Sequence, residues 1–96
     1  MSQTASVTVR LTNKRGLHAR ASAQFVTCVE RFQSQVDVTS HNQVGSETVV
    51  ADSIMELLML GSACGEEITI KAEGVDAQEA VTALEALVKD NFGEGE

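Results

Sequence analysis

Four short stretches of alternating apolar and polar residues, separated by stretches with helical spacing, constrain the fold of this chain most strongly. Over residues 6–12, Val7, Val9 and Leu11 fall on one side, and two threonines and an arginine on the other. A period of two with one apolar side is typical of a half-buried strand. The same alternation predicts further strands over 35–40, 46–51 and 67–72.

Helical spacing of apolar residues predicts three helices, over about 19–32, 53–60 and 76–91. Ser53 and Glu56 have the spacing of a capping box at the start of the second helix, and Gly61 is placed to end it. Asp76 is expected to be the N-cap of the third. A hairpin turn is expected over residues 41–45, which contain His41.

The resulting order is βαββαβα. Strands with one polar face favour an antiparallel sheet whose other face is covered by helices. We therefore expect an α+β fold in which a four-stranded antiparallel sheet carries three helices on one face. The 96 residues are expected to form a single domain over 1–96, long enough to bury a core without metal or disulfides.

Charge is distributed unevenly along the chain, whose net charge is −7. Arg10, Lys14, Arg15 and Arg20 all precede the first acidic residue, Glu30. A net-acidic chain without Trp or Tyr is poorly suited to general nucleic-acid binding, by phosphate contacts or by base stacking. A local basic region suits a small anion or an acidic surface on a partner protein.

The two cysteines, Cys28 and Cys64, lack the spacing of metal ligands with each other or with either histidine. We expect no metal site, and free thiols in a reducing cytosol, although one bridge between them is also compatible with the sequence. No stretch is apolar and long enough to span a membrane. A cytoplasmic protein is therefore expected.

The segment Gly16-Leu17-His18-Ala19-Arg20 places a histidine directly before an expected helix. Backbone N–H groups at a helix start are unsatisfied and favour anions. A neutral imidazole there could attack a phosphoryl donor, and Arg20 could hold the transferred group. Gly16 would permit a tight turn before the histidine. From the residues alone, a capped surface histidine is an equally good interpretation of His18.

A resemblance adds to this reading. The segment 16–26, from Gly16 to Val26, resembles the active-site segment of HPr proteins, the histidine-containing phosphocarriers of the bacterial phosphotransferase system. Residues 52–61 resemble the family's short second helix, and residues 67–74 its last strand. The order βαββαβα agrees with the open-faced sandwich of that family.

The resemblance implies a phosphocarrier, not an enzyme, that needs no cofactor. It implies that Nδ1 of His18 accepts a phosphoryl group and that Arg20 contacts it. Enzyme I, charged by phosphoenolpyruvate, would be the donor, and IIA-type proteins the acceptors. No nucleic acid or membrane is implied as a partner, and a monomer is expected.

Two positions depart from the family pattern. Ala21 stands where the family usually has proline, which pre-sets φ in the first turn of a helix. Ser53 stands where Gram-positive members carry a regulatory phosphoserine, but Ala51-Asp52 replaces the usual Gly-Lys before it. Helix capping is therefore the favoured role of Ser53, and phosphorylation is the alternative.

The second expected helix has more apolar residues than one buried face can hold. Ile54, Leu57 and Leu60 are the expected core residues. Met55, Leu58 and Met59 are expected on the surface, where an apolar patch would dock partner proteins together with Gly16 and Ala19. The alternative is that the whole helix is buried.

The run 57–60 (Leu-Leu-Met-Leu), Ala21 and the acidic ending 91–96 resemble NPr proteins, the nitrogen-related branch of the family. A carrier for sugar uptake, as in HPr proper, is the first alternative. A regulatory module that binds a partner without using His18 is the second, and an anion or metal sensor is the third.

Overall fold

The computed structural model describes residues 2–42, 45–60 and 62–93, and its elements follow the predicted order. Strands and helices alternate, and a short 3₁₀ turn follows the last helix. In chain order the elements are β1 (Gln3–Arg10), α1 (Ala19–Val29), β2 (Gln35–Asn42), β3 (Gly45–Val50), α2 (Ile54–Leu60), β4 (Glu67–Gly74), α3 (Ala77–Lys89) and η1 (Asn91–Gly93).

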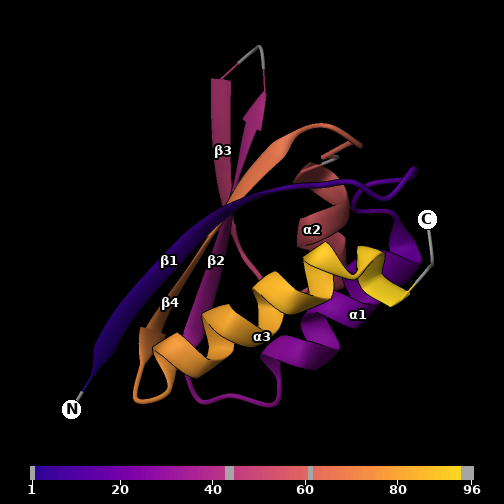
Figure 1. The fold of residues 1–96 in the computed structure, drawn as a ribbon. Helices are drawn as coiled ribbons and strands as arrows, with labels where there is room; N and C mark the ends of the chain where they lie inside the picture. The colour runs from indigo at the N-terminus through magenta and orange to yellow at the C-terminus, as the bar shows by residue number, and fades with distance from the viewer. Residues whose placement is uncertain (1, 43–44, 61, 94–96) are drawn as a thin grey trace.

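The strands form one antiparallel sheet with the order β1-β4-β2-β3. The helices lie together on one side of it, where α3 packs on β1 and β4, α2 packs on β3, and α1 contacts both other helices (Figure 1). The other side of the sheet faces solvent. This is the predicted α+β open-faced sandwich.

The solvent face of the sheet carries one threonine from each strand at the same level. Thr8, Thr69, Thr39 and Thr48 are successive partners in the strand register. Their hydroxyls bond in pairs, Thr8 to Thr69 at 2.8 Å and Thr39 to Thr48 at 2.7 Å. The opposite face is apolar and packs on the helices. The largest buried core residues are Phe25, Phe92, Leu11, Leu57, Ile68, Ile70 and Leu84.

Helix α1 ends at Val29, three residues earlier than predicted, although Phe32 still packs against the core. The N–H groups of Arg31 and Phe32 bond to the carbonyls of Cys28 and Val29, at 3.1 and 3.0 Å. Such three-residue hydrogen bonds are typical of a tightened last turn.

The interpretation of His41 as a turn residue is wrong. His41 lies in β2 opposite Ser46, and its Nε2 bonds to the Thr69 hydroxyl at 2.7 Å. The pairing continues to Asn42 and Gly45. Strand β2 is therefore longer than predicted, because the His41 side chain bonds to Thr69 on β4. Residues 43 and 44 of the predicted turn lie outside the described residues.

The end of the chain also differs from the prediction. Helix α3 stops at Lys89, and Asn91 and Phe92 both adopt left-handed backbone conformations, with φ of +53° and +55°. This turn directs Phe92 into the core, where it is 1 % exposed. The Thr12 hydroxyl donates a hydrogen bond to the Asn91 side-chain oxygen, which joins this turn to the chain after β1.

The loop 13–17 between β1 and α1 packs against the loop 62–66 that follows α2. Gly16 has φ of +59°, and a Cβ added to it would lie 2.2 Å from the Ser62 carbonyl oxygen. The buried Asn13 amide donates to the Gly16 carbonyl at 2.8 Å. These contacts fix the path of the chain into α1, so Gly16 is required for close backbone approach.

Asp76 connects the start of α3 to the chain between α1 and β2. Its carboxylate accepts hydrogen bonds from the Ser34 hydroxyl at 2.6 Å and from the Gln33 N–H at 2.9 Å. Asp76 is the N-cap residue of α3, as predicted, and its carbonyl accepts the Ala80 N–H at 2.9 Å, but its side chain makes no cap bond to the helix. The Ser34 hydroxyl, followed by the Gln33 N–H, holds the pKa of Asp76 below its ordinary value of 3.8.

We expect Gly16→Ala to destabilise the protein by about 2 kcal/mol or more, because it combines left-handed backbone strain with a clash against the Ser62 carbonyl. Gly65→Ala is the matched control, since Gly65 also has positive φ but open space around it. Urea unfolding of both variants measures the difference. Equal losses of unfolding free energy in the two variants would show that the contact with Ser62 does not constrain the loop.

Asp76→Asn should lower stability near neutral pH and have less effect as pH falls. A carboxyl whose folded pKa is depressed stabilises the fold above its unfolded pKa, and this contribution disappears as pH falls through the folded pKa. Urea unfolding of parent and variant between about pH 7 and pH 2 tests this. The two curves should converge as pH falls through the depressed folded pKa of Asp76; a constant gap would contradict the assignment.

Candidate functional site

His18 is the N-cap of α1, as the sequence predicted. Its backbone is extended, with φ of −73° and ψ of 179°, and its carbonyl accepts the Ser22 N–H at 2.8 Å. Its Nδ1 atom accepts the Arg20 backbone N–H at 3.2 Å. The imidazole therefore takes the place that a Ser or Asp side chain usually fills at a helix start.

The hydrogen bond from Arg20 identifies the ring nitrogen that faces the helix. A nitrogen that accepts an N–H carries a lone pair, which in a neutral imidazole leaves the proton on Nε2. The lone pair of Nδ1 is thus directed toward the N–H groups of the first turn of α1. Any group bonded to Nδ1 would place its outer atoms beside these donors.

The backbone on the other side of His18 is also fixed. The N–H of the buried Leu17 donates to the Ser62 carbonyl at 2.9 Å, and the Leu17 carbonyl accepts the Ser22 hydroxyl at 3.1 Å. The imidazole itself is half-buried. A rigid backbone therefore presents a partly accessible ring.

Basic residues lie in the first turn of this helix and in the segments that precede it. Arg20 is exposed in the first turn, and Lys14 and Arg15 are exposed in the preceding loop. Arg10 lies at the end of β1, 3.6 Å from the Glu67 carboxylate. The first turn of α1 contains no acidic residue. An incoming anion would meet the helix dipole and these side chains together.

Ala21 does not prevent a regular helix start. The residue is fully buried, and α1 begins at Ala19 with His18 as its cap. Alanine has the highest helix propensity, which replaces part of what proline would contribute by fixing φ.

Helix α2 presents an apolar surface close to this site. Met59 is 74 %, Met55 65 % and Ile54 40 % exposed, and we call these three residues the α2 patch. Ile54 was expected in the core, and this is corrected: Leu57 is fully buried, whereas Ile54 begins the helix on its outer side. Leu58 and Leu60 are half-buried, and Leu60 packs against the core.

The end of α2 is joined to the chain beside His18 through the loop that follows the helix. Met59 precedes Ser62 by three residues, and Ser62 bonds to Leu17, next to His18. Ala19 is exposed at the start of α1, but Gly16 is buried beneath the loop 62–66. The expected docking role of Gly16 is therefore corrected to a backbone role.

Ser53 caps α2. Its hydroxyl accepts the Glu56 N–H at 3.4 Å, and its carbonyl accepts the Leu57 N–H at 3.3 Å. The predicted capping box is thus half formed on the serine side.

Cys28 and Cys64 are both free thiols, Cys28 buried and Cys64 exposed. Burial raises the pKa of Cys28, and the nearby Arg31 partly opposes this. Across residues 2–42, 45–60 and 62–93, no three His, Cys, Asp or Glu side chains lie close enough together to hold a metal ion. In the same ranges, no helix has the length and apolar character needed to cross a membrane.

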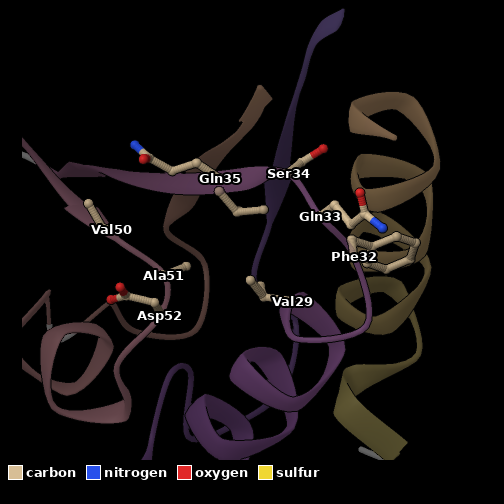
Figure 2. Close-up of a pocket in the computed structure, with 9 residues that line it drawn as sticks. Val29, Phe32, Gln33, Ser34, Gln35, Val50, Ala51 and Asp52 are labelled. Carbon is tan, nitrogen blue, oxygen red and sulfur yellow. The ribbon is translucent and has the colours of Figure 1, made fainter. Parts of the chain in front are cut away.

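A pocket of about 320 Å³ lies at the other end of α1 from His18. Val29, from the last turn of α1, and Ala51, which follows β3, point toward it, with Phe32 and Asp52 on opposite sides (Figure 2). This pocket is remote from the imidazole. His18 instead lies at the other end of α1 and is half-buried.

The sequence did not identify Ser62, whose carbonyl holds Leu17. No sequence pattern could have identified it, because a backbone carbonyl contact across 45 positions leaves no local signal.

Comparison with known proteins identifies the family to which this chain belongs. Residues 5–90 match the family described as the PTS HPr component phosphorylation site. Phosphocarrier protein HPr from Cupriavidus necator is 44 % identical over 84 residues, which cover 88 % of this chain and 90 % of the relative. Phosphocarrier protein NPr from Escherichia coli is 37 % identical over 91 residues, covering 95 % and 98 %.

A solved structure agrees with these relatives. The crystal structure of HPr from Thermoanaerobacter tengcongensis superposes with a TM-score of 0.83 at 40 % identity, covering 94 % of this chain and 97 % of that one. The match of sequence and fold extends over almost the whole chain. The chain therefore belongs to the HPr family, and it is a phosphoryl carrier of the phosphotransferase system, not a catalyst.

Proposed function

We propose that Nδ1 of His18 is the atom that carries the phosphoryl group. The single observation that supports this most strongly is the hydrogen bond from the Arg20 N–H to Nδ1. It places the lone pair of Nδ1 at the helix start. A phosphoryl group on Nδ1 would meet backbone donors, whereas Nε2 is the ring nitrogen that does not accept the Arg20 N–H.

The electrostatics of the site favour the charged product. A phosphoryl group adds close to two negative charges, and the N–H groups at the start of α1 stabilise such a group. Arg20 is exposed one helical position beyond Ala19, where its guanidinium can pair with phosphate oxygens in a fork geometry. After transfer, the Arg20 N–H can donate to a phosphoryl oxygen in place of Nδ1.

Enzyme I, charged by phosphoenolpyruvate, is the proposed donor, and IIA-type proteins are the proposed acceptors. In the forward step the Nδ1–P bond forms as the bond between phosphorus and the donor atom on enzyme I breaks. In the second step the Nδ1–P bond breaks as the acceptor attacks phosphorus. His18 keeps the Nε2 proton through both steps, so no proton transfer or cofactor is required.

The α2 patch is the proposed docking surface for these partners. Ile54, Met55 and Met59 expose apolar side chains on a helix that packs against α1. Ala19 and the half-buried Leu58 would lie at the edge of this contact. Flexible methionines adapt to differently shaped partners, which suits a carrier that must recognise both a donor and an acceptor.

We further propose that the carrier serves the nitrogen-related branch, as a monomer in the cytoplasm. Its relatives include proteins named HPr and proteins named NPr. The run Leu57 to Leu60 and the acidic ending support the NPr assignment. Transfer rates to a nitrogen-type and a sugar-type IIA protein, measured side by side, distinguish the branches: faster transfer to the sugar-type protein would favour the alternative.

His18→Ala should abolish labelling by enzyme I and radiolabelled phosphoenolpyruvate, because the acceptor nitrogen is removed. The parent should give an acid-labile, alkali-stable phosphoprotein. His41→Ala is the matched control, since His41 is bonded on the sheet face away from the helices, and should label normally. Undiminished labelling of His18→Ala would refute the proposed site and favour a binding module that does not use this histidine.

Met59→Glu should raise the KM for enzyme I by about tenfold or more, because a charge would be buried in an apolar contact. The maximal rate at saturating enzyme I should change little. Val75→Glu is the control, since Val75 is 53 % exposed but lies between β4 and α3. A similar rise in KM for both variants would contradict docking through the α2 patch.

A further inference from the structure

Two buried serines connect the central part of the sheet to the loop that supports His18. Ser40 lies on the inner face of β2 and is 1 % exposed, and Ser62 follows α2 and is 3 % exposed. The Ser62 hydroxyl donates to the Ser40 hydroxyl at 2.8 Å. The proposed role of His18 as phosphoryl carrier uses neither hydroxyl.

The same Ser62 residue holds the chain next to His18 with its backbone. Its carbonyl accepts the Leu17 N–H at 2.9 Å. The Leu17 carbonyl in turn accepts a hydrogen bond from the Ser22 hydroxyl, so both polar groups of the Leu17 backbone are bonded. The position of His18 therefore depends on where the Ser62 carbonyl lies.

Close packing at Gly16 makes this connection stiff. A Cβ on Gly16 would lie 2.2 Å from the Ser62 oxygen and 2.8 Å from the Ala63 Cα. The two loops are thus in backbone contact with little space between them. A shift of Ser62 would be passed to residues 16 and 17 instead of being absorbed by flexible side chains.

We propose that Ser62, held by Ser40, is a positioning residue for phosphoryl transfer at His18. This inference rests on the proposed function of His18. A buried hydroxyl is costly unless it is hydrogen-bonded, whereas alanine would fill a core position at lower cost. The serine pair gives a directional contact between β2 and the loop 62–66, which apolar packing would not.

The chemistry of transfer explains why such positioning matters. Phosphoryl transfer depends mainly on the alignment of donor, phosphorus and acceptor, and a misplacement of about 1 Å can cost about a hundredfold in rate. The hydrogen bond between the Arg20 N–H and Nδ1 is long, at 3.2 Å. A small movement of the His18 backbone would therefore alter the direction of the acceptor lone pair.

The test uses the full chain with Ser62→Ala, Ser40→Ala and the double variant. Ser34→Ala is the matched control, because it also removes a buried serine hydroxyl, one that bonds to Asp76. Each protein is assayed for the kcat and KM of phosphorylation by enzyme I. Nitrogen NMR of the His18 ring and the Arg20 amide, recorded without any phosphoryl donor, reports the geometry of the site independently.

We expect Ser62→Ala and Ser40→Ala each to lower kcat by about tenfold with little change in KM, and the double variant to lose no more than either single variant. The His18 and Arg20 signals should shift in these variants but not in Ser34→Ala. If one variant does not fold, the other removes the same hydrogen bond from its opposite end.

Unchanged kcat and unchanged His18 signals in folded Ser62→Ala or Ser40→Ala would overturn the inference. An equal loss of kcat in Ser34→Ala would also overturn it, because the effect would then follow general stability. Failure of the proposed function would give a different result. The His18→Ala variant would then be phosphorylated normally by enzyme I, whatever the effect of the serine variants on the NMR signals.

Discussion

The hydrogen bond from the Leu17 N–H to the Ser62 carbonyl joins the two loops on which the site depends. One loop leads from the edge strand β1 into α1, and the other leads from α2 into the neighbouring strand β4. Because the two backbones meet at Gly16, the start of α1 and the end of α2 are held together. The proposed phosphoryl site at the start of α1 is therefore linked to the end of the helix that carries the proposed docking surface.

The chemistry of the site requires few groups. An extended backbone at His18 makes the imidazole the cap of α1, and the cap bond selects Nδ1 as the nitrogen beside the helix N–H groups. The same donors that hold the free imidazole in place can bind a phosphoryl group. The basic residues Arg15 and Arg20 add charge without enclosing the ring. An open site of this kind suits a carrier, because both partners must reach the same atom.

The sequence was sufficient to predict the order of elements, the two faces of the sheet and the N-cap position of His18. Local patterns determine each of these features: period-two alternation, helical spacing, and a polar residue before an apolar helix. The family resemblance added a phosphoryl acceptor and partners as proposals, which periodicity alone could not supply.

The errors occurred where distant contacts decide the structure. His41 continues β2 because Thr69 on β4 offers a hydrogen bond. Helix α3 ends at Lys89, before the predicted end at about Asn91, and the turn that follows it buries Phe92 in the core. Ile54 is apolar but lies on the outer side of α2, since Leu57 fills the core below that helix. The Ser40–Ser62 contact spans 22 positions and involves two ordinary serines, so no local pattern indicates it.

The most direct test of the central claim is to locate the phosphoryl group on the protein. Enzyme I and phosphoenolpyruvate would phosphorylate nitrogen-labelled protein, and combined phosphorus and nitrogen NMR would identify the atom bonded to phosphorus. We expect a single phosphorus–nitrogen coupling to Nδ1 of His18, with a large shift of the Arg20 amide. Phosphorus on Nε2, or on any other residue, would contradict it.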